Sequence, residues 1–201
     1  MPSSVKASSL ILASGSPRRR DLLTAARIPF VIHESKIDEI RREGEEAVPF
    51  ALRMAREKAL SVAEVYPGEV ILAADTIVEL DGEVLGKPSD AADARRILRL
   101  LSDRTHRVVT AYALVRNGRI IEAMPVISHV TFRALTRDEI ERYLMTGEPF
   151  DKAGAYGIQG MGANFIVAVE GDRSNVMGLP VKEVLAALAR LGISPSPSPA
   201  K

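Results

Sequence analysis

The chain has 201 residues, of which 46% are hydrophobic and 26% charged, a composition typical of a globular domain with a sizeable core. Its formal net charge of +1, its lack of Trp and its 4% aromatic content argue against a globally cationic nucleic-acid binder or a base-stacking platform. The absence of cysteine excludes disulfides, thiolate catalysis and Cys-ligated zinc.

The apolar runs are too short for a signal peptide at the N-terminus or for a membrane-spanning helix further along. The three histidines, His33, His106 and His129, are far apart and lack the spacing of metal ligands. We therefore expect a cytoplasmic protein that binds neither nucleic acid nor membranes.

The first predicted elements are a buried strand over residues 10–13 and a helix that begins at Pro17. Between them Ser14 and Gly15 turn the chain, and Ser16 is a suitable N-cap for the helix. Proline is favoured at the first helical position because its missing N–H would have no partner there. The pattern therefore predicts a strand, a tight turn and a helix in direct succession.

Three arginines, Arg18, Arg19 and Arg20, occupy the first turn of this helix. The helix dipole disfavours positive charge at that end by about 0.3–1 kcal/mol for each cation. Because free backbone N–H groups at a helix N-terminus bind anions, the arrangement indicates a site for an anion such as phosphate. The alternative is an ordinary solvated helix start.

The remaining patterns alternate between helices and strands. Helical patterns cover residues 48–65, 90–101, 136–145 and 180–191, and a charged loop or lid covers 34–46. Strand patterns cover residues 29–33, 70–74, 107–115, 119–132 and 164–170, with hairpin signals at Asp81-Gly82 and Asn117-Gly118. We predict an α/β fold with a mixed central β-sheet flanked by helices, split into two lobes around a cleft. It forms one domain over residues 1–192, and a disordered Ser/Pro tail covers 193–201.

Four charged residues are candidates for chemistry. Asp75 directly follows a predicted buried strand, where ligand sites of α/β sheets lie, and it could hold Mg²⁺, act as a general base or cap a turn. Lys58, Lys87 and Glu39 could each equally be ordinary surface charges. Lys58 has Glu57 beside it, which is also typical of a salt-bridged helix face.

The segment 151–160, DKAGAYGIQG, has three glycines and indicates a backbone that approaches a ligand closely or adopts positive φ. Gln159 offers both a donor and an acceptor, as recognition of a base edge requires. The alternative is a tight structural loop. Neither GxxxxGK[ST] nor GxGxxG occurs in the chain.

Taken together, arginines at a helix start, lysines, carboxylates and an amide suit a polyphosphate substrate with a divalent metal. The cations would neutralise phosphates, and the carboxylates would hold the ion or activate water. Near several cations, Asp75 is expected to stay ionised at pH 7, so it could accept a proton directly or act through a metal-bound water without a raised pKa. The residues alone therefore predict a metal-assisted phosphate-ester or anhydride enzyme.

Five segments together resemble the Maf family of nucleoside triphosphate pyrophosphatases. They are LASGSPRRRDLL (12–23), AADTIV (73–78), GEVLGKP (82–88), DKAGAYGIQG (151–160) and NVMGLP (175–180), in the same order and spacing as in the family. The resemblance implies a cytoplasmic enzyme with an elongated, two-lobed Maf/ITPase-like fold, frequently a homodimer. It also implies cleavage of a nucleoside triphosphate to the monophosphate and pyrophosphate with a divalent cation, Mg²⁺ or Mn²⁺.

The same resemblance implies roles for individual residues. Asp75 would be the proton acceptor, Glu39 and Asp75 would serve the metal, and Lys58 and Lys87 would face phosphate in the cleft. Phosphate contacts are implied for Ser14 and Arg19, and substrate choice for Arg18, Thr76 and Gln159, whereas Arg20 has no assigned role.

This combination resembles the dTTP/UTP branch of the family, with modified pyrimidine nucleotides as further possible substrates. The alternative function is a non-catalytic nucleotide-binding regulator of cell division or septum formation, which would keep the same anion site. Only a turnover assay discriminates the two.

Overall fold

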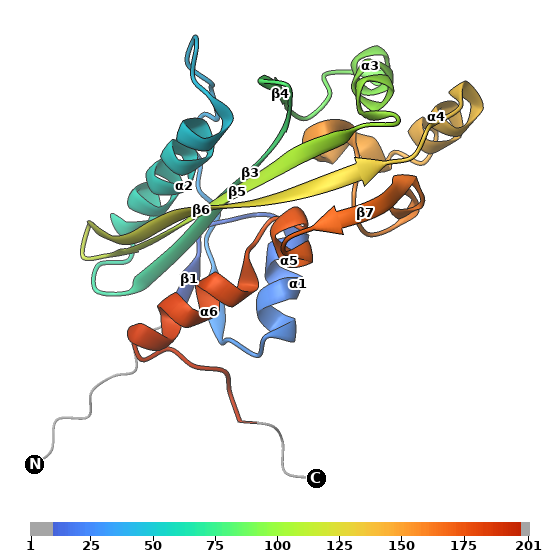
Figure 1. Cartoon of the computed structure of the whole chain (residues 1–201). Coiled ribbons are helices and arrows are strands. Elements are labelled where there is room, and N and C mark those ends of the chain that lie inside the picture. Colours follow the sequence, from blue (N-terminus) through green and yellow to red (C-terminus); the bar gives the residue numbers. More distant parts are fainter. Residues whose placement is uncertain (1–9, 198–201) are drawn as a thin grey trace, which may run out of the picture.

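The computed structural model describes residues 10–197, and its centre is a seven-stranded mixed sheet (Figure 1). The strands follow the order β2-β1-β3-β5-β6-β7, and β4 pairs with β3 off this path. Their bounds are β1 Leu10–Leu12, β2 Phe30–Ile32, β3 Val70–Leu80, β4 Glu83–Leu85, β5 Thr105–Arg116, β6 Arg119–Phe132 and β7 Ile166–Glu170.

The sheet combines a short parallel part with a long antiparallel part. β1 lies between β2 and β3 and runs parallel to both, whereas β3, β5 and β6 pair in antiparallel fashion. The β5–β6 hairpin turns at Asn117 and Gly118, whose φ angles of 52° and 67° suit the predicted two-residue turn. The α/β fold with a mixed central sheet flanked by helices is thereby confirmed.

Helices cover both faces and one end of the sheet (Figure 1). α2 packs on one face, α1 and α6 lie on the opposite face, and α3 and α4 gather at the far end of the long strands. Their bounds are α1 Pro17–Ala25, α2 Ala47–Ala63, α3 Ala91–Leu101, α4 Arg137–Leu144, α5 Arg173–Val176 and α6 Val181–Arg190. Three short 3₁₀ helices are η1 Glu148–Asp151, η2 Ala153–Ala155 and η3 Met161–Phe165.

Strand β3 connects the separate parts of the core. Ile71 and Ala73 point into the cluster under α2, whereas Leu72 and Ala74 point into the cluster under α1 and α6. This alternation follows from the two-residue period of a strand. Further along, Val78 belongs to a third cluster with α3, α4 and the 3₁₀ helices. β3 therefore contributes side chains to all three clusters of the core.

The prediction that β3 ends at Ala74 is wrong. The strand continues to Leu80, because β5 pairs with it over residues 70–79, with Asp75 opposite Ala111 and Thr76 opposite Thr110. The apolar run stops at Asp75 because that side chain faces the pocket, while its backbone stays in the ladder. Asp75 thus lies beyond the end of β1 rather than beyond the end of its own strand.

The capping residues predicted for α3 and α4 are confirmed, whereas the one predicted for α1 makes no capping contact. Asp90 caps α3 by accepting from the Asp93 N–H, and Thr136 and Glu139 form the predicted capping box of α4. Ser16 stands at the N-cap of α1, but its side chain makes no capping hydrogen bond. Two short elements, β4 and α5, were not among the predicted ones.

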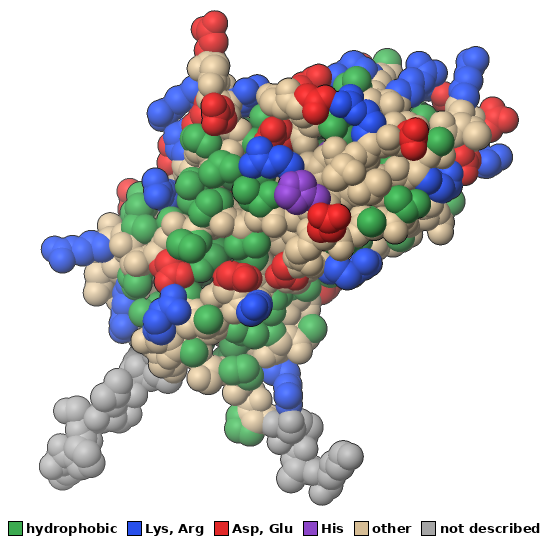
Figure 2. Space-filling model, viewed as in Figure 1, with side chains coloured by type: hydrophobic (Ala, Val, Ile, Leu, Met, Phe, Trp, Pro, Cys, Tyr) green, Lys and Arg blue, Asp and Glu red, His purple; other side chains and the backbone are tan. Residues whose placement is uncertain are grey.

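The C-terminal segment begins with ordered contacts. Ile193 is buried, and the Ser196 N–H donates to the Arg27 carbonyl at 2.8 Å. Residues 198–201 of the predicted tail lie outside the described residues, and the single domain over 1–192 stays a prediction. Among the described residues, no helix combines the length and apolar character that a membrane crossing requires. Lys, Arg, Asp and Glu side chains are spread over the face of the molecule that Figure 2 shows.

Candidate active site

A pocket of about 330 Å³ opens beside Asp75 and Thr76 of β3. This volume is within the usual range for small-molecule sites. Its walls come from the turn before α1, the loop after β2, α2, β3, the segment after β4, the 151–158 segment and the loop after α5. Of the nine predicted site residues, eight line it: Ser14, Arg18, Arg19, Glu39, Lys58, Asp75, Thr76 and Lys87.

At the floor of the pocket one ammonium group joins two carboxylates. Lys58 Nζ lies 2.7 Å from Asp75 Oδ1 and 2.8 Å from Glu39 Oε1. The Lys58 and Asp75 side chains are only 8% and 7% exposed, whereas that of Glu39 is 48% exposed. A buried ion pair on β3 and α2 is therefore extended toward solvent by a carboxylate from the loop after β2.

Lys58 reaches Asp75 because it lies on the buried face of α2, between Ala55 and Ala59. Small side chains there let the helix approach the sheet closely. The alternative that Lys58 belongs to a salt-bridged surface with Glu57 is wrong, since Glu57 pairs with Arg53 and Arg42 instead.

Burial and charge act in opposite directions on the two carboxylates. Burial raises the pKa of Asp75 above its ordinary value, and the positive charges of Lys58 and Arg19 offset this only in part. The expectation of an unraised pKa is wrong, because it counted the nearby cations and left out desolvation. Burial also raises the pKa of Glu39, but the hydrogen bond and charge of Lys58 outweigh it and leave a net lowering.

Arg19 is held by acceptors from three different segments. Its Nε donates to the Gly178 carbonyl at 2.8 Å, Nη1 to Ser14 Oγ at 3.1 Å and Nη2 to Thr76 Oγ1 at 3.2 Å. The φ of Gly178 is +111°, a value that side chains rarely allow, so glycine lets this carbonyl face the guanidinium. Two of the five guanidinium N–H groups are left for a ligand.

Ser14 and Thr76, on either side of Arg19, offer opposite hydrogen-bonding groups. Ser14 Oγ accepts from the Ser16 N–H at 3.2 Å and from Arg19, so both its lone pairs are used and its hydrogen can point to a ligand. Thr76 accepts from Arg19 and lies 3.0 Å from Thr110 Oγ1.

The Thr110 hydroxyl donates to the Asn175 carbonyl at 2.8 Å, because two oxygen lone pairs would repel each other at that distance. Thr110 can then only accept from Thr76, so the Thr76 hydrogen is already used. Thr76 therefore presents a lone pair, and no hydrogen, to the pocket. Thr110 and Asn175 are fully buried, and sequence reasoning assigns neither a role: Thr110 lies in an ordinary strand pattern, and Asn175 belongs to the NVMGLP segment only as part of the family resemblance.

Of Arg18, Arg20 and Gln159, only Arg18 lines the pocket. Arg18 lines the pocket and contacts Asp151 across its mouth at 3.3 Å. Arg20 lies outside the pocket lining with Asp21 3.8 Å away, as an ordinary surface charge would. Gln159 is exposed and is not part of the lining, although its neighbour Ile158 is. The role of Gln159 in substrate choice stays a prediction.

The donor set suits a divalent ion that arrives with phosphate. Within residues 10–197, no group of three or more His, Asp or Glu side chains could enclose a metal. Glu39 and Asp75 nevertheless both contact the Lys58 ammonium and both line the pocket, so the two carboxylates lie close together there. Mg²⁺ commonly binds through one or two carboxylates together with waters and substrate phosphates, and these residues fit that pattern.

The fold and the pocket define an α/β protein with a central mixed sheet and a polar pocket lined by arginine, lysine and carboxylate side chains. The same fold is found in a HAM1 protein from Coxiella burnetii, which matches with a TM-score of 0.52 and 19% identity over 91% of this chain and 99% of that one.

The chain belongs to the Maf family: the family model described as Maf-like protein matches residues 9–191. A dTTP/UTP pyrophosphatase of Myxococcus xanthus is 50% identical over 184 residues, 92% of this chain and 93% of the relative. One of Halalkalibacterium halodurans is 47% identical over 185 residues, 92% of this chain and 97% of the relative.

Proposed function

We propose that this protein is a nucleoside triphosphate pyrophosphatase that hydrolyses dTTP and UTP to the monophosphate and pyrophosphate. The observation that carries the proposal is the position of Lys58 between Asp75 and Glu39, in the pocket that also holds Arg19 and Lys87. The choice of dTTP and UTP is supported by relatives that are 47–50% identical over nearly their whole length and are dTTP/UTP pyrophosphatases.

The triphosphate would bind where positive charge and free donors converge. Ser14 would donate its hydroxyl hydrogen, Arg19 its two unused N–H groups, and Lys87 its ammonium. The start of α1 also lines the pocket, and the positive end of its helix dipole would favour an anion there. Ser14 and Arg19 are held by their protein contacts, so little reorganisation of these two side chains would accompany binding.

Asp75 would take a proton from the attacking water. Its Oδ1 accepts from Lys58, which leaves Oδ2 for that water. Without a bound metal, burial raises the pKa of this carboxylate, which favours uptake of a proton. Water would attack phosphorus, the bond between the α- and β-phosphates would break, and Arg19 and Lys58 would stabilise the charge of the departing pyrophosphate.

A divalent cation, Mg²⁺ or Mn²⁺, would be held by Glu39 and Asp75 and would neutralise phosphate charge. Arg18 and Thr76 would contribute to nucleotide choice from the pocket wall, and Gln159 from the rim. Modified pyrimidine nucleotides are included among the proposed substrates. We also propose that the protein is cytoplasmic, that it forms a homodimer, and that it binds neither nucleic acid nor membranes.

The test is a product analysis with dTTP and UTP in the presence of Mg²⁺. Equal amounts of nucleoside monophosphate and pyrophosphate are expected over many turnovers. Orthophosphate with a nucleoside diphosphate would contradict the proposal. Binding of nucleotide without any turnover would favour the alternative function, a non-catalytic regulator of cell division.

A further inference from the structure

Glu39 lies on a loop that has no helix or strand of its own. The loop runs over residues 33–46, between β2 and α2, and its residues 38–44 are exposed. The Glu39 side chain is half exposed and contacts the site through Lys58. A loop with few buried contacts is free to move unless something else fixes it.

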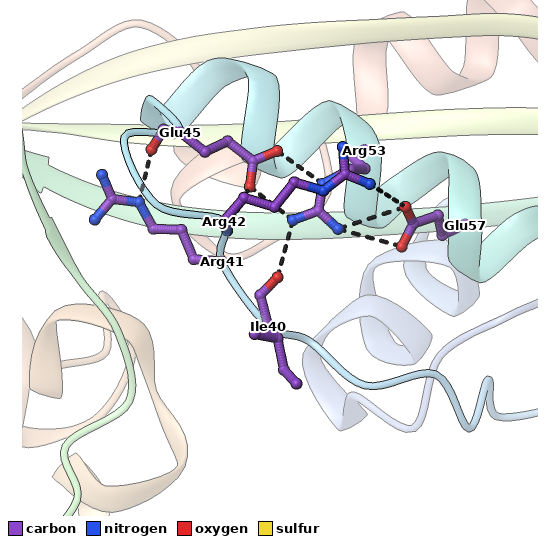
Figure 3. Close-up of polar contacts among 6 residues, drawn as sticks. All are labelled: Ile40, Arg41, Arg42, Glu45, Arg53 and Glu57. Atoms are coloured by element: carbon purple, nitrogen blue, oxygen red, sulfur yellow. Dashed lines mark hydrogen bonds and ion pairs between the residues drawn. The ribbon is translucent and has the colours of Figure 1, made fainter.

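Arg53 on α2 provides such a fixation (Figure 3). Its Nε and Nη2 donate to Glu45 Oε1 and Oε2 at 2.7 and 2.6 Å, a two-point contact with the last part of the loop. Nη2 also donates to the Ile40 carbonyl at 2.9 Å, and Nη1 contacts Glu57 on the next turn of α2. One guanidinium thus joins the helix to both ends of the segment 40–45.

Glu45 in turn closes this segment on itself (Figure 3). Its Oε2 accepts from the Arg42 N–H at 3.1 Å, and its carbonyl accepts from Arg41 Nε at 2.6 Å. Ile40 directly follows Glu39, so anchoring the Ile40 carbonyl anchors the backbone one residue beyond Glu39 and restricts where the Glu39 side chain can lie. Lys58 lies on the same helix as Arg53, and one rigid element therefore sets both the backbone of Glu39 and the ammonium that Glu39 contacts.

We propose that Arg53 is a positioning residue: with Glu45 it clamps the loop after β2 and holds the Glu39 carboxylate over Lys58 and Asp75. The effect on catalysis rests on the proposed function, whereas the effect on the loop does not.

An isolated surface ion pair would not carry this proposal, since most of them contribute little. This pair differs because it is bidentate, its side chains are only 17% and 11% exposed, and a backbone carbonyl shares the same guanidinium. The hydrogen bond from Arg53 also lowers the pKa of Glu45 to about 2, so the pair stays charged at every working pH. A lysine lacks the planar fork and would hold only one of these acceptors at a time.

The chain offers a matched control. Arg95 on α3 makes the same two-point contact with Glu141 on α4, at 2.5 and 2.7 Å, and neither residue lines the pocket. Arg53→Met and Arg95→Met remove the same charge and keep most of the apolar stem. Arg53→Lys keeps the charge without the fork, and Glu45→Gln removes the charged acceptor.

The experiment is limited digestion with trypsin, without nucleotide or metal, which cuts after Arg41 and Arg42 once the loop opens. We expect cleavage at these two sites to be about tenfold faster in Arg53→Met than in the wild type. Arg53→Lys and Glu45→Gln should lie between them, and Arg95→Met should match the wild type. Equal thermal unfolding of Arg53→Lys and wild type would show that loop opening, not global unfolding, is measured. Unchanged cleavage in all three clamp variants would overturn the proposal.

Kinetics then test the link to Glu39. In Arg53→Met and Arg53→Lys, we expect kcat to fall about tenfold or more and the Mg²⁺ concentration for half-maximal rate to rise, with the KM for dTTP changed less than threefold. Arg95→Met should leave all three values unchanged. Faster cleavage with unaltered kinetics would overturn the positioning role. If the wild type hydrolysed no nucleotide, the proposed function alone would fail, and the trypsin comparison would still decide whether Arg53 holds the loop.

Discussion

Thr76 on β3 and Thr110 on β5 are register partners, and their hydroxyl oxygens lie 3.0 Å apart. Thr110 donates to the Asn175 carbonyl, so Thr76 must donate to Thr110 and accept from Arg19. A buried residue on a neighbouring strand therefore decides how Thr76 and Arg19 face the pocket.

This relationship predicts the effect of Thr110→Val, which keeps the shape but removes the hydroxyl. The Thr76 hydroxyl then loses its acceptor and its fixed orientation, so it holds the Arg19 guanidinium less firmly. The KM for dTTP should therefore rise about tenfold, with a smaller change in kcat. Thr110→Ser should restore the wild-type values. The control is Thr105→Val, which removes the same hydroxyl from an exposed Thr105–Thr131 pair at the start of β5. Equal KM values for the Thr110→Val and Thr105→Val variants would contradict the prediction.

The second prediction concerns Asp75 itself. Asp75→Asn keeps the size of the side chain but cannot take a proton from water, so kcat should fall about 100- to 10,000-fold. Lys58 retains Glu39 as its partner, and binding of dTTP, measured by calorimetry, should persist. A variant that turns over at nearly the wild-type rate would remove Asp75 from the role of base.

Nucleotide choice gives a third prediction. Arg18 lines the pocket, whereas Gln159 is exposed outside its lining. Arg18→Trp should therefore change the relative kcat/KM values for UTP, dTTP and GTP more than Gln159→Glu does. Rates for the three nucleotides, measured side by side for both variants and the wild type, test this. Identical ratios in all three proteins would contradict a selecting role for either residue.

The fourth prediction concerns pH and stability. His106 is buried with its Nε2 2.7 Å from the Tyr156 hydroxyl, and burial lowers its pKa from 6.5 to about 4. Between these pH values the unfolded chain binds a proton that the folded protein does not, so the free energy of unfolding falls as pH drops from 6.5 to 4.

The loss attributable to His106 should be about 2–3 kcal/mol. His106→Gln has no group that titrates in this range but can still contact Tyr156. Urea unfolding at pH 7 and at pH 4.5 should show a smaller decrease for the variant than for the wild type. Parallel decreases in the two proteins would mean that His106 is not the group responsible.

Much of the fold could be predicted because local patterns and tertiary packing agree. The helix start at Pro17, the hairpin at Asn117-Gly118 and the capping box at Thr136 all depend on neighbours in sequence. The extent of β3 could not be predicted in this way. A polar residue in an apolar run marks a strand end in sequence, but here pairing with β5 continues past Asp75.

The candidate site divides similarly. Composition, spacing and the family resemblance pointed to eight residues that line the pocket, while Gln159 lies outside its lining. Arg53 and Thr110 carry no sequence signal, and Asn175 lies in the NVMGLP segment without an assigned role, because each acts through contacts with residues 8 to 67 positions away.

Periodicity, turn residues and charge are local properties, and they are enough to predict the α/β class, the order of most elements and the chemical types that line the pocket. The contact of Lys58 with both Asp75 and Glu39, the lone pair offered by Thr76 and the raised pKa of Asp75 become visible only in the folded protein. Those properties depend on distance, burial and the direction of each hydrogen bond, which arise only when separate elements pack together.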